Sequence, residues 1–214
     1  MTTKVRSSKP YHHGALRQAL IGEAMEALEK EGLDGLSLRG LAASAGVSKT
    51  APYRHFADKH ELLVTLAAEG FRELADVLEA AALGAPAADH ATPDAKPAGI
   101  PDGPTRGIRM LFRAYLQFAR TRPALYQLMV SRLGFSLHSE SCRINSGRAF
   151  QCLVRAVENA QKAGWRSERN TMAVVLSLWA EVHGWALLLI EDLLPPEAVG
   201  PNADTAGMAE ALLD

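Results

Sequence analysis

Apolar side chains recur at spacings of three and four residues along most of the chain, the pattern of helices that bury one face. Such stripes predict helices over Gly14 to Glu31, Lys59 to Ala82 and Glu168 to Leu194, the last being the longest apolar one, and another that begins near Thr105. No run of alternating apolar and polar residues with β-branched enrichment and turns at both ends appears. The pattern therefore predicts an all-α protein.

Two shorter helical units lie between the first two stripes. Ser37 can cap a helix over Leu38 to Ala45, which ends at a turn at Gly46. Ser48 can cap a second short helix that reaches about Phe56, and Asp58 can cap the long helix that follows. Two short helices that close on a third across a glycine turn form a helix-turn-helix.

The remaining elements follow from prolines and glycines. Residues 83–107 hold five of the eleven prolines and four glycines, which predicts a long mobile loop rather than a helix. A helix from Pro123 to Leu133, an irregular segment from Gly134 to Asn145, a helix from Ala149 to Ala163 and a short helix over Ala203 to Leu213 are predicted after it. The predicted domains are a flexible basic arm at 1–13, a helix-turn-helix domain at 14–60 and a larger helical domain at 61–214.

Charge and cysteine content change this picture in two ways. The net charge of the 214 residues is -1, but residues 1–60 carry nine basic and six acidic side chains, which indicates an N-terminal part that faces nucleic acid. Cys142 and Cys152 show no CxxC spacing and are interpreted as small core residues of a cytoplasmic protein. A disulfide scaffold and a disordered chain are excluded. Met172 to Ile190 is nearly long enough to span a membrane, but Glu181 in its middle argues against a span.

The second short helix carries the candidate DNA-binding side chains. It would present Lys49, Thr50, Tyr53, Arg54 and His55 outward, a set that can donate to phosphates and to base edges in a major groove. The alternative is a helical hairpin with a solvated polar face. The basic, aromatic and hydroxyl groups gather on one short segment between small capping residues, which favours DNA binding.

These residues resemble the signature of the TetR family of bacterial transcriptional regulators over about residues 12–70. The matching motifs are Ser37, Arg39, Leu41 and Ala42; Ala45 to Ser48; Tyr53, His55 and Phe56; and Lys59, Leu62 and Leu63. The resemblance implies that Tyr53 and His55 brace and contact the DNA backbone, that Lys59 meets a phosphate at the start of the next helix, that Lys49, Thr50 and Arg54 face bases, and that Arg39 contacts DNA from the preceding helix. Ser37 and Ser48 are also predicted to be DNA-binding residues.

Two positions depart from the family pattern. Pro52 stands where an aliphatic residue is usual, and its missing N–H forgoes one helical hydrogen bond, at modest cost in a first turn. Gly40 lowers helix propensity by up to about 1 kcal/mol relative to Ala. Neither position changes the helix-turn-helix interpretation.

The C-terminal part carries a weaker resemblance to a Trp-His-Gly type of ligand-binding domain, through Trp179, His183 and Gly184. A single His on an apolar helix is more often a hydrogen-bonded core residue, and Gly184 is interpreted as a close-packing position. We nevertheless predict a ligand pocket where aromatic and thioether side chains of several helices converge. The candidate lining residues are Phe112, Tyr115, Tyr126, Met129, Trp179 and His183. Ordinary core packing of the same residues is the alternative.

The sequence shows no recognisable catalytic pattern. Cys142 with His138, or Ser141 and Ser177, lie in no elbow or triad motif, and no phosphate-binding glycine loop or zinc spacing occurs. No enzyme activity, cofactor or metal is expected.

The prediction is a cytoplasmic, ligand-responsive repressor that binds double-stranded operator DNA of near-palindromic sequence. It is expected to respond to a small-molecule effector and to form a homodimer through Thr171 to Leu194 and the terminal helix near Met208 to Leu213, because apolar side chains surround the former helix. The alternatives are a dimeric DNA-binding protein without an effector and, for the apolar helix, burial within one chain. The basic arm either adds DNA contacts or is a disordered tail.

Overall fold

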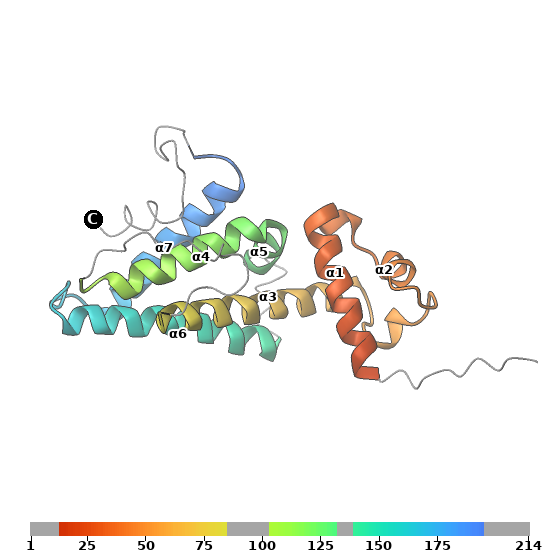
Figure 1. Cartoon of the computed structure of the whole chain (residues 1–214), viewed down its shortest axis with the longest axis horizontal. Helices are drawn as coiled ribbons and strands as arrows, with labels where there is room; N and C mark the ends of the chain where they lie inside the picture. Colours follow the sequence, from red (N-terminus) through yellow and green to blue (C-terminus); the bar gives the residue numbers. More distant parts are fainter. Residues whose placement is uncertain (1–12, 85–102, 132–138, 195–214) are drawn as a thin grey trace, which may run out of the picture. The chain divides into compact units, whose positions relative to one another are not determined.

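The computed structural model describes residues 13–84, 103–131 and 139–194, which form seven α-helices and one turn of 3-10 helix (Figure 1). These residues contain no strand, so the all-α prediction is confirmed. The chain divides into two compact units, residues 1–66 and 67–214. The predicted basic arm, most of the predicted loop at 83–107 and the predicted terminal helix lie outside the described residues.

The first unit is built on helix α1 (His13–Gly35) and helix α2 (Leu38–Ser44). Leu20, Ala24 and Leu28 of the predicted stripe are buried. Gly32 interrupts α1 with a positive φ of 71°, which a glycine adopts without steric cost, so the helix breaks where the sequence predicts its end. The Ser37 hydroxyl accepts a hydrogen bond from the Gly40 N–H at 3.0 Å and caps α2 as predicted.

The second helix of the predicted helix-turn-helix is shorter than the sequence indicated. Instead of a helix from Ser48 to Phe56, the structure has a turn and then one 3-10 turn, Pro52–Arg54. Pro52 has no N–H to donate to the Ser48 carbonyl, and that carbonyl accepts from the Ala51 N–H at 2.9 Å instead, in an i to i+3 bond. The proline noted in the sequence therefore tightens this segment, and the predicted α-helix is wrong.

Helix α3 (Lys59–Ala82) begins and ends where the sequence predicts. Asp58 Oδ1 accepts from the Glu61 N–H at 2.8 Å, and Glu61 Oε2 accepts from the Ala57 N–H at 2.7 Å. This reciprocal arrangement satisfies two backbone donors at the helix start. The helix runs without interruption past the boundary between residues 66 and 67.

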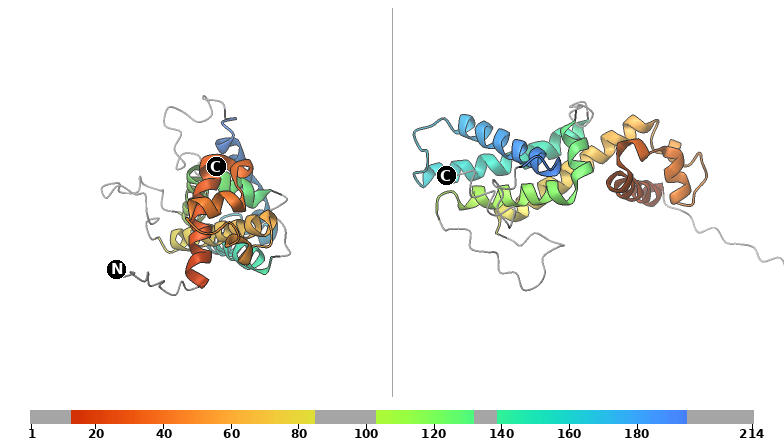
Figure 2. Two further views of the ribbon diagram at one scale, coloured as in Figure 1. Left: turned by 90° about the vertical axis from the view of Figure 1, so that its right-hand side faces the viewer. Right: turned by 90° about the horizontal axis from the view of Figure 1, so that it is seen from above.

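The second unit contains the rest of α3 and four further helices: α4 (Arg106–Thr121), α5 (Pro123–Val130), α6 (Glu140–Lys162) and α7 (Thr171–Ile190). Helices α4, α6 and α7 pack against one another, and α5 packs against α4 (Figures 1 and 2). Arg148 of α6 pairs with Asp76 and Glu79 of α3 at 2.8 and 2.7 Å.

Two helix starts differ from the sequence prediction. Helix α6 begins at Glu140, inside the segment predicted to be irregular, because the Ser139 hydroxyl caps it through the Cys142 N–H at 3.4 Å. Helix α7 begins at Thr171 rather than Glu168 because Asn170 caps it, and it is therefore shorter than α3. Cys142 and Cys152 are free thiols and buried, in agreement with their interpretation as core residues.

Glycine has a packing role at Gly70 in α3, which approaches α5 closely. A Cβ at this position would lie 2.6 Å from Met129 Sδ and 3.0 Å from Leu125 Cδ1, too close for a methyl group. The interpretation of Gly184 as a close-packing position is wrong within the described chain, because a Cβ there would meet nothing within 4 Å.

Helix α7 has one buried and one open apolar face. Val174, Val175, Leu178, Val182 and Ala186 form the face that is buried in the second unit. The exposed large apolar side chains of α7 are those of Met172, Leu176, Leu187 and Leu188, together with Trp179, which also lines the cavity described below. Helix α7 is long and apolar enough to cross a membrane by length and composition alone. One face of α7 packs against α4 and α6, and this test by itself is weak evidence for a span.

Candidate functional site

The predicted DNA-binding residues form an exposed stretch of the first unit. The side chains of Ser37, Arg39, Ser48, Lys49, Thr50, Tyr53, Arg54 and Lys59 are exposed, and that of His55 is half-buried. Pro52 and Phe56 of the same stretch are buried. The buried pair anchors the 3-10 turn in the unit, while the residues between and beside them face solvent.

Local contacts organise this stretch. Ser48 Oγ and Thr50 Oγ1 lie 3.3 Å apart, which links two hydroxyls at the start of the turn. Arg17 of α1 places its guanidinium 5.4 Å from the centre of the Phe56 ring. The Lys59 ammonium donates to the Leu33 carbonyl at 2.6 Å, a contact that the sequence did not predict. An ammonium has three N–H donors, so Lys59 keeps two for another acceptor.

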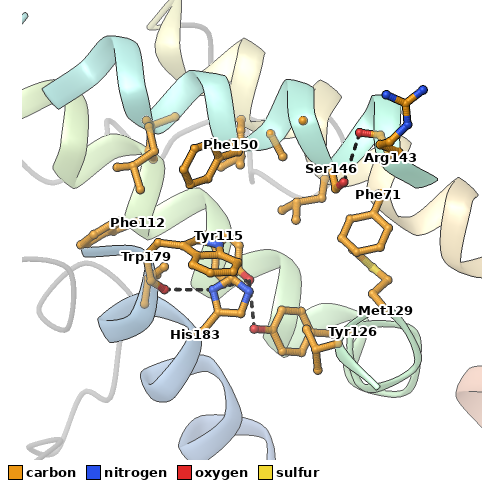
Figure 3. A pocket seen from close by; sticks show the side chains of 18 residues that line it. Phe71, Phe112, Tyr115, Tyr126, Met129, Arg143, Ser146, Phe150, Trp179 and His183 are labelled. Atoms are coloured by element: carbon orange, nitrogen blue, oxygen red, sulfur yellow. Dashed lines mark hydrogen bonds between the residues drawn. The ribbon is translucent and has the colours of Figure 1, made fainter. Parts of the chain in front are cut away.

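The second unit contains a cavity of about 300 Å³ between helices α3, α4, α5, α6 and α7 (Figure 3). All six residues predicted to line a pocket, Phe112, Tyr115, Tyr126, Met129, Trp179 and His183, lie in its wall. The six predicted residues belong to three helices, α4, α5 and α7. The structure places them in the wall of one cavity.

Further lining residues come from helices α3 and α6. These are Phe71, Leu74 and Leu78 of α3 and Arg143, Ser146, Gly147, Ala149, Phe150 and Leu153 of α6; Leu111 of α4, Val130 of α5 and Val182 of α7 complete the lining. The signal for them is present in the sequence as apolar spacings of three and four, such as Phe71, Leu74 and Leu78, but such spacing does not distinguish a cavity wall from a packed core.

Four polar groups meet at one end of the cavity, which we call the tyrosine–histidine corner: Tyr115, Tyr126, His183 and the Trp179 carbonyl. The hydroxyls of Tyr115 and Tyr126 lie 3.0 Å apart. The Tyr115 hydroxyl lies 3.0 Å from His183 Nε2 and 3.3 Å from Nδ1, and His183 Nδ1 lies 3.0 Å from the Trp179 carbonyl oxygen. Trp179 also contacts the His183 ring edge to face, with centroids 4.7 Å apart.

Burial keeps all three titratable groups of this corner uncharged. Removal from water raises the pKa of Tyr115 well above its usual value and that of Tyr126 to about 12. Burial also lowers the pKa of His183, although its bond to the Trp179 carbonyl partly opposes this shift. The corner therefore holds two phenols and a neutral imidazole at neutral pH.

Arg143 is the one fully charged residue of the described cavity lining. Its side chain is exposed, and its nitrogen atoms point away from Tyr115 and His183 (Figure 3). Among the described residues, no group of three or more His, Cys, Asp or Glu side chains is arranged to hold a metal ion.

An exposed basic segment on a helix-turn-helix unit, joined to a second helical unit that holds a cavity, is the architecture of a DNA-binding transcriptional regulator. Family models agree with this class at both ends of the chain. Residues 20–66 match the model of bacterial regulatory proteins of the tetR family, and residues 108–214 match the tetracyclin repressor-like C-terminal domain. The chain belongs to the TetR family, a family of transcriptional regulators and not of enzymes.

Solved structures share this fold. A protein of unknown function from Rhodococcus sp. RHA1 is 31% identical, with 96% of this chain and 97% of that chain covered and a TM-score of 0.72. A TetR/AcrR family regulator from Thermobifida fusca is 17% identical, with 92% and 94% covered and a TM-score of 0.64. AibR, solved with isovaleryl coenzyme A and operator DNA, is 16% identical, with 92% and 95% covered and a TM-score of 0.59. No curated protein is significantly similar in sequence.

Proposed function

We propose that this protein is a cytoplasmic, ligand-responsive repressor that binds a near-palindromic operator as a homodimer. The observation that carries the proposal is the presence, on one chain, of an exposed basic helix-turn-helix stretch and a mostly apolar cavity. The AibR structure supports it, because that relative in fold was solved with both a small-molecule thioester and operator DNA.

The proposed DNA contacts divide by chemistry. Residues 48–56, the turn and the 3-10 turn after it, are called the recognition turn. Lys49, Thr50 and Arg54 are exposed on it and supply donors for base edges, with Arg54 able to bind guanine through two hydrogen bonds. The remaining exposed residues, Ser37, Arg39, Ser48, Tyr53 and Lys59, together with the half-buried His55, supply contacts to phosphates. Such contacts position the protein on DNA but carry no sequence information.

The proposed dimer uses the open face of α7. Met172, Leu176, Leu187 and Leu188 are exposed apolar residues along one helix, and a second copy with the same face covers them in a self-complementary interface. The predicted helix at 203–213 would add to this interface but lies outside the described residues. Two-fold symmetry of the protein then imposes two-fold symmetry on the operator.

The effector acts by preferring one conformation of the protein. A ligand shifts the equilibrium between DNA-binding and non-binding forms only by its difference in affinity for the two. Helix α3 is the proposed connection, because it contributes Phe71, Leu74 and Leu78 to the cavity wall and begins beside the recognition turn at Lys59.

Selection of DNA by the purified protein from a random pool tests the DNA part of this proposal. We expect recovery of a near-palindromic site bound by two subunits. Recovery of no preferred sequence, or of a site without symmetry that binds one subunit, would contradict it.

A cavity-filling variant tests the effector part. Ala149 lies in the cavity wall on α6, and Ala149→Phe places a ring where the effector is proposed to bind. We expect this variant to bind the selected site with wild-type affinity but to lose release by a cell extract or metabolite pool that releases the wild type. Release that is equal in both proteins would place the effector elsewhere, and the absence of any releasing compound would favour a DNA-binding protein without an effector.

A further inference from the structure

The tyrosine–histidine corner fixes the direction of its own hydrogen bonds. A carbonyl oxygen can only accept, so the bond between His183 Nδ1 and the Trp179 carbonyl requires the proton on Nδ1. In the neutral imidazole the other nitrogen, Nε2, is then an acceptor. The Tyr115 hydroxyl lies 3.0 Å from Nε2 and 3.3 Å from Nδ1, and we assign its proton to Nε2, the one ring nitrogen that can accept in this tautomer.

The same reasoning continues to Tyr126. The single Tyr115 proton is used on His183, so the 3.0 Å contact between the two hydroxyls is made by the Tyr126 O–H donating to the Tyr115 oxygen. The bonds therefore run in one direction, from Tyr126 to Tyr115 to His183 to the Trp179 carbonyl. Every hydrogen-bond donor of the three side chains is used inside this corner, and what remains is acceptor capacity on the two phenol oxygens.

The rest of the described cavity wall offers a ligand no charge in its interior. The lining is apolar apart from this corner, the Trp179 indole N–H, Ser146 and Arg143, and the Arg143 nitrogens point away from the corner (Figure 3). The Ser146 hydroxyl donates to the Arg143 carbonyl at 3.3 Å. An ionised group drawn into such a cavity loses its hydration without gaining a partner of opposite charge, which is strongly unfavourable.

We propose that the effector is an uncharged apolar molecule with a hydroxyl group, a phenol or an alcohol, that donates its hydrogen bond to a phenol oxygen of Tyr126 or Tyr115. This inference rests on the proposed function, because it names the ligand class of the same cavity. A ketone, ester or ether brings only acceptors and meets acceptors at the corner. An amide brings a donor but also a carbonyl for which the corner has no proton, and an amine or a carboxylate brings a charge.

Three probes with one apolar body and different polar groups separate these cases. We use para-butylphenol, which donates, para-butylanisole, which only accepts, and para-butylbenzoate, which is anionic, and measure each by calorimetry on the intact protein without DNA. The phenol is expected to bind about tenfold more tightly than the anisole, the size of one well-placed hydrogen bond. The benzoate is expected to bind more weakly than the phenol.

A variant of His183 shows whether the direction of the bonds causes this preference. His183→Phe removes the acceptor that holds the Tyr115 proton, so the tyrosine pair regains a free donor and can bind the anisole oxygen. The ratio of phenol to anisole affinity is expected to fall from about tenfold to near one. Phe112→Leu, a change in the apolar part of the same wall, is the matched control and is expected to weaken both probes while leaving the ratio unchanged.

The ratio of phenol to anisole affinity in the wild-type protein decides the proposal even where His183→Phe fails to fold. Equal or tighter binding of the anisole, tightest binding of the benzoate, or no binding of any probe would overturn it. These results concern ligand binding alone. The proposed function fails separately, when the selected DNA shows no preferred site or when no compound changes the affinity for that site.

Discussion

The His183 imidazole is a half-buried base whose protonation matters for stability. Its pKa in the folded protein is lowered, mainly by burial, whereas an unfolded chain has a histidine pKa of about 6.5. The side chains that face it, Tyr115, Tyr126 and Trp179, carry no charge at these pH values, and the Trp179 carbonyl already accepts from it.

We therefore expect the free energy of unfolding to fall as the pH drops from about 6.5 towards the lower folded pKa, since the unfolded state takes up the proton first. Above that window the contribution is constant, and below the folded pKa it levels off. Urea unfolding of the wild type and of His183→Gln over this pH range checks it. A wild-type stability whose pH dependence matches that of the variant would contradict the role of His183.

The Lys59 ammonium combines a structural and a proposed DNA contact. Lys59→Ala removes the bond to the Leu33 carbonyl and is expected to destabilise the protein by about 0.5–1 kcal/mol, since the site is exposed. It is also expected to weaken specific and non-specific DNA binding alike and to reduce the salt dependence by about one ion per subunit.

Affinity measured over a series of salt concentrations checks the DNA effect, and urea unfolding checks the stability effect. A loss confined to the specific site, with an unchanged salt dependence, would show that Lys59 meets no phosphate.

At the scale of elements, the approach of α3 and α5 at Gly70 is expected to be sensitive to a single methyl group. Gly70→Ala would place a Cβ 2.6 Å from Met129 Sδ and 3.0 Å from Leu125, which forces the side chains or the helices apart. We expect a loss of about 1–3 kcal/mol by thermal or urea unfolding. Gly22→Ala in α1 is the control, because a Cβ there meets nothing within 4 Å.

The control substitution is expected to stabilise the protein by about 0.5–1 kcal/mol through higher helix propensity. In a Met129→Ala background, which is itself destabilised, the additional loss caused by Gly70→Ala is expected to be smaller, because the methyl group then has room; a double-mutant cycle measures this coupling. Equal effects of the two glycine substitutions would show that the helices do not meet tightly at Gly70.

The sequence predicted elements best where capping residues adjoin long stripes. Ser37 and Asp58 cap α2 and α3 as expected, because their hydroxyl or carboxylate stands directly before a periodic segment. The sequence did not predict the start of α6, because residues 140–149 contain few apolar side chains. No apolar stripe therefore indicates the part of the helix that Ser139 caps. The sequence predicted a helix from Ser48 to Phe56, which is longer than the one found. The missing N–H of Pro52 leaves a 3-10 turn in its place.

The candidate site was predictable in composition but not in detail. Aromatic and thioether residues on three helices indicated a pocket, and all of them lie in the cavity wall. The hydrogen bonds that join Tyr115 of α4, Tyr126 of α5 and His183 of α7 depend on how helices far apart in sequence pack, which no local pattern encodes. The sequence offered two descriptions of His183, a hydrogen-bonded core residue and a pocket residue. Both apply, because the side chain is hydrogen-bonded and lines the cavity.

At the scale of the whole molecule, the open face of α7 predicts the oligomeric state. Leu176→Glu in the middle of that face buries a charge in the proposed interface and is expected to shift the protein from dimer to monomer at micromolar concentration, as measured by light scattering. The matched control is Ile144→Glu, because Ile144 is exposed to a similar extent on α6. A dimer that persists equally in both variants, or a wild-type monomer, would contradict the proposed interface.

DNA recognition by the exposed turn is the central claim, and one affinity measurement tests it most directly. The double variant Lys49→Ala, Arg54→Ala is titrated by fluorescence anisotropy with the selected site and with an unrelated sequence, at one salt concentration. Arg155→Ala, Lys162→Ala serves as the control, because it removes the same charge from exposed positions of α6.

Each recognition side chain is expected to contribute about 1–3 kcal/mol of discrimination, so the double variant should lose most of its preference for the selected site while the control keeps it. A double variant that remains folded and binds the selected site with unchanged affinity and preference would contradict the account.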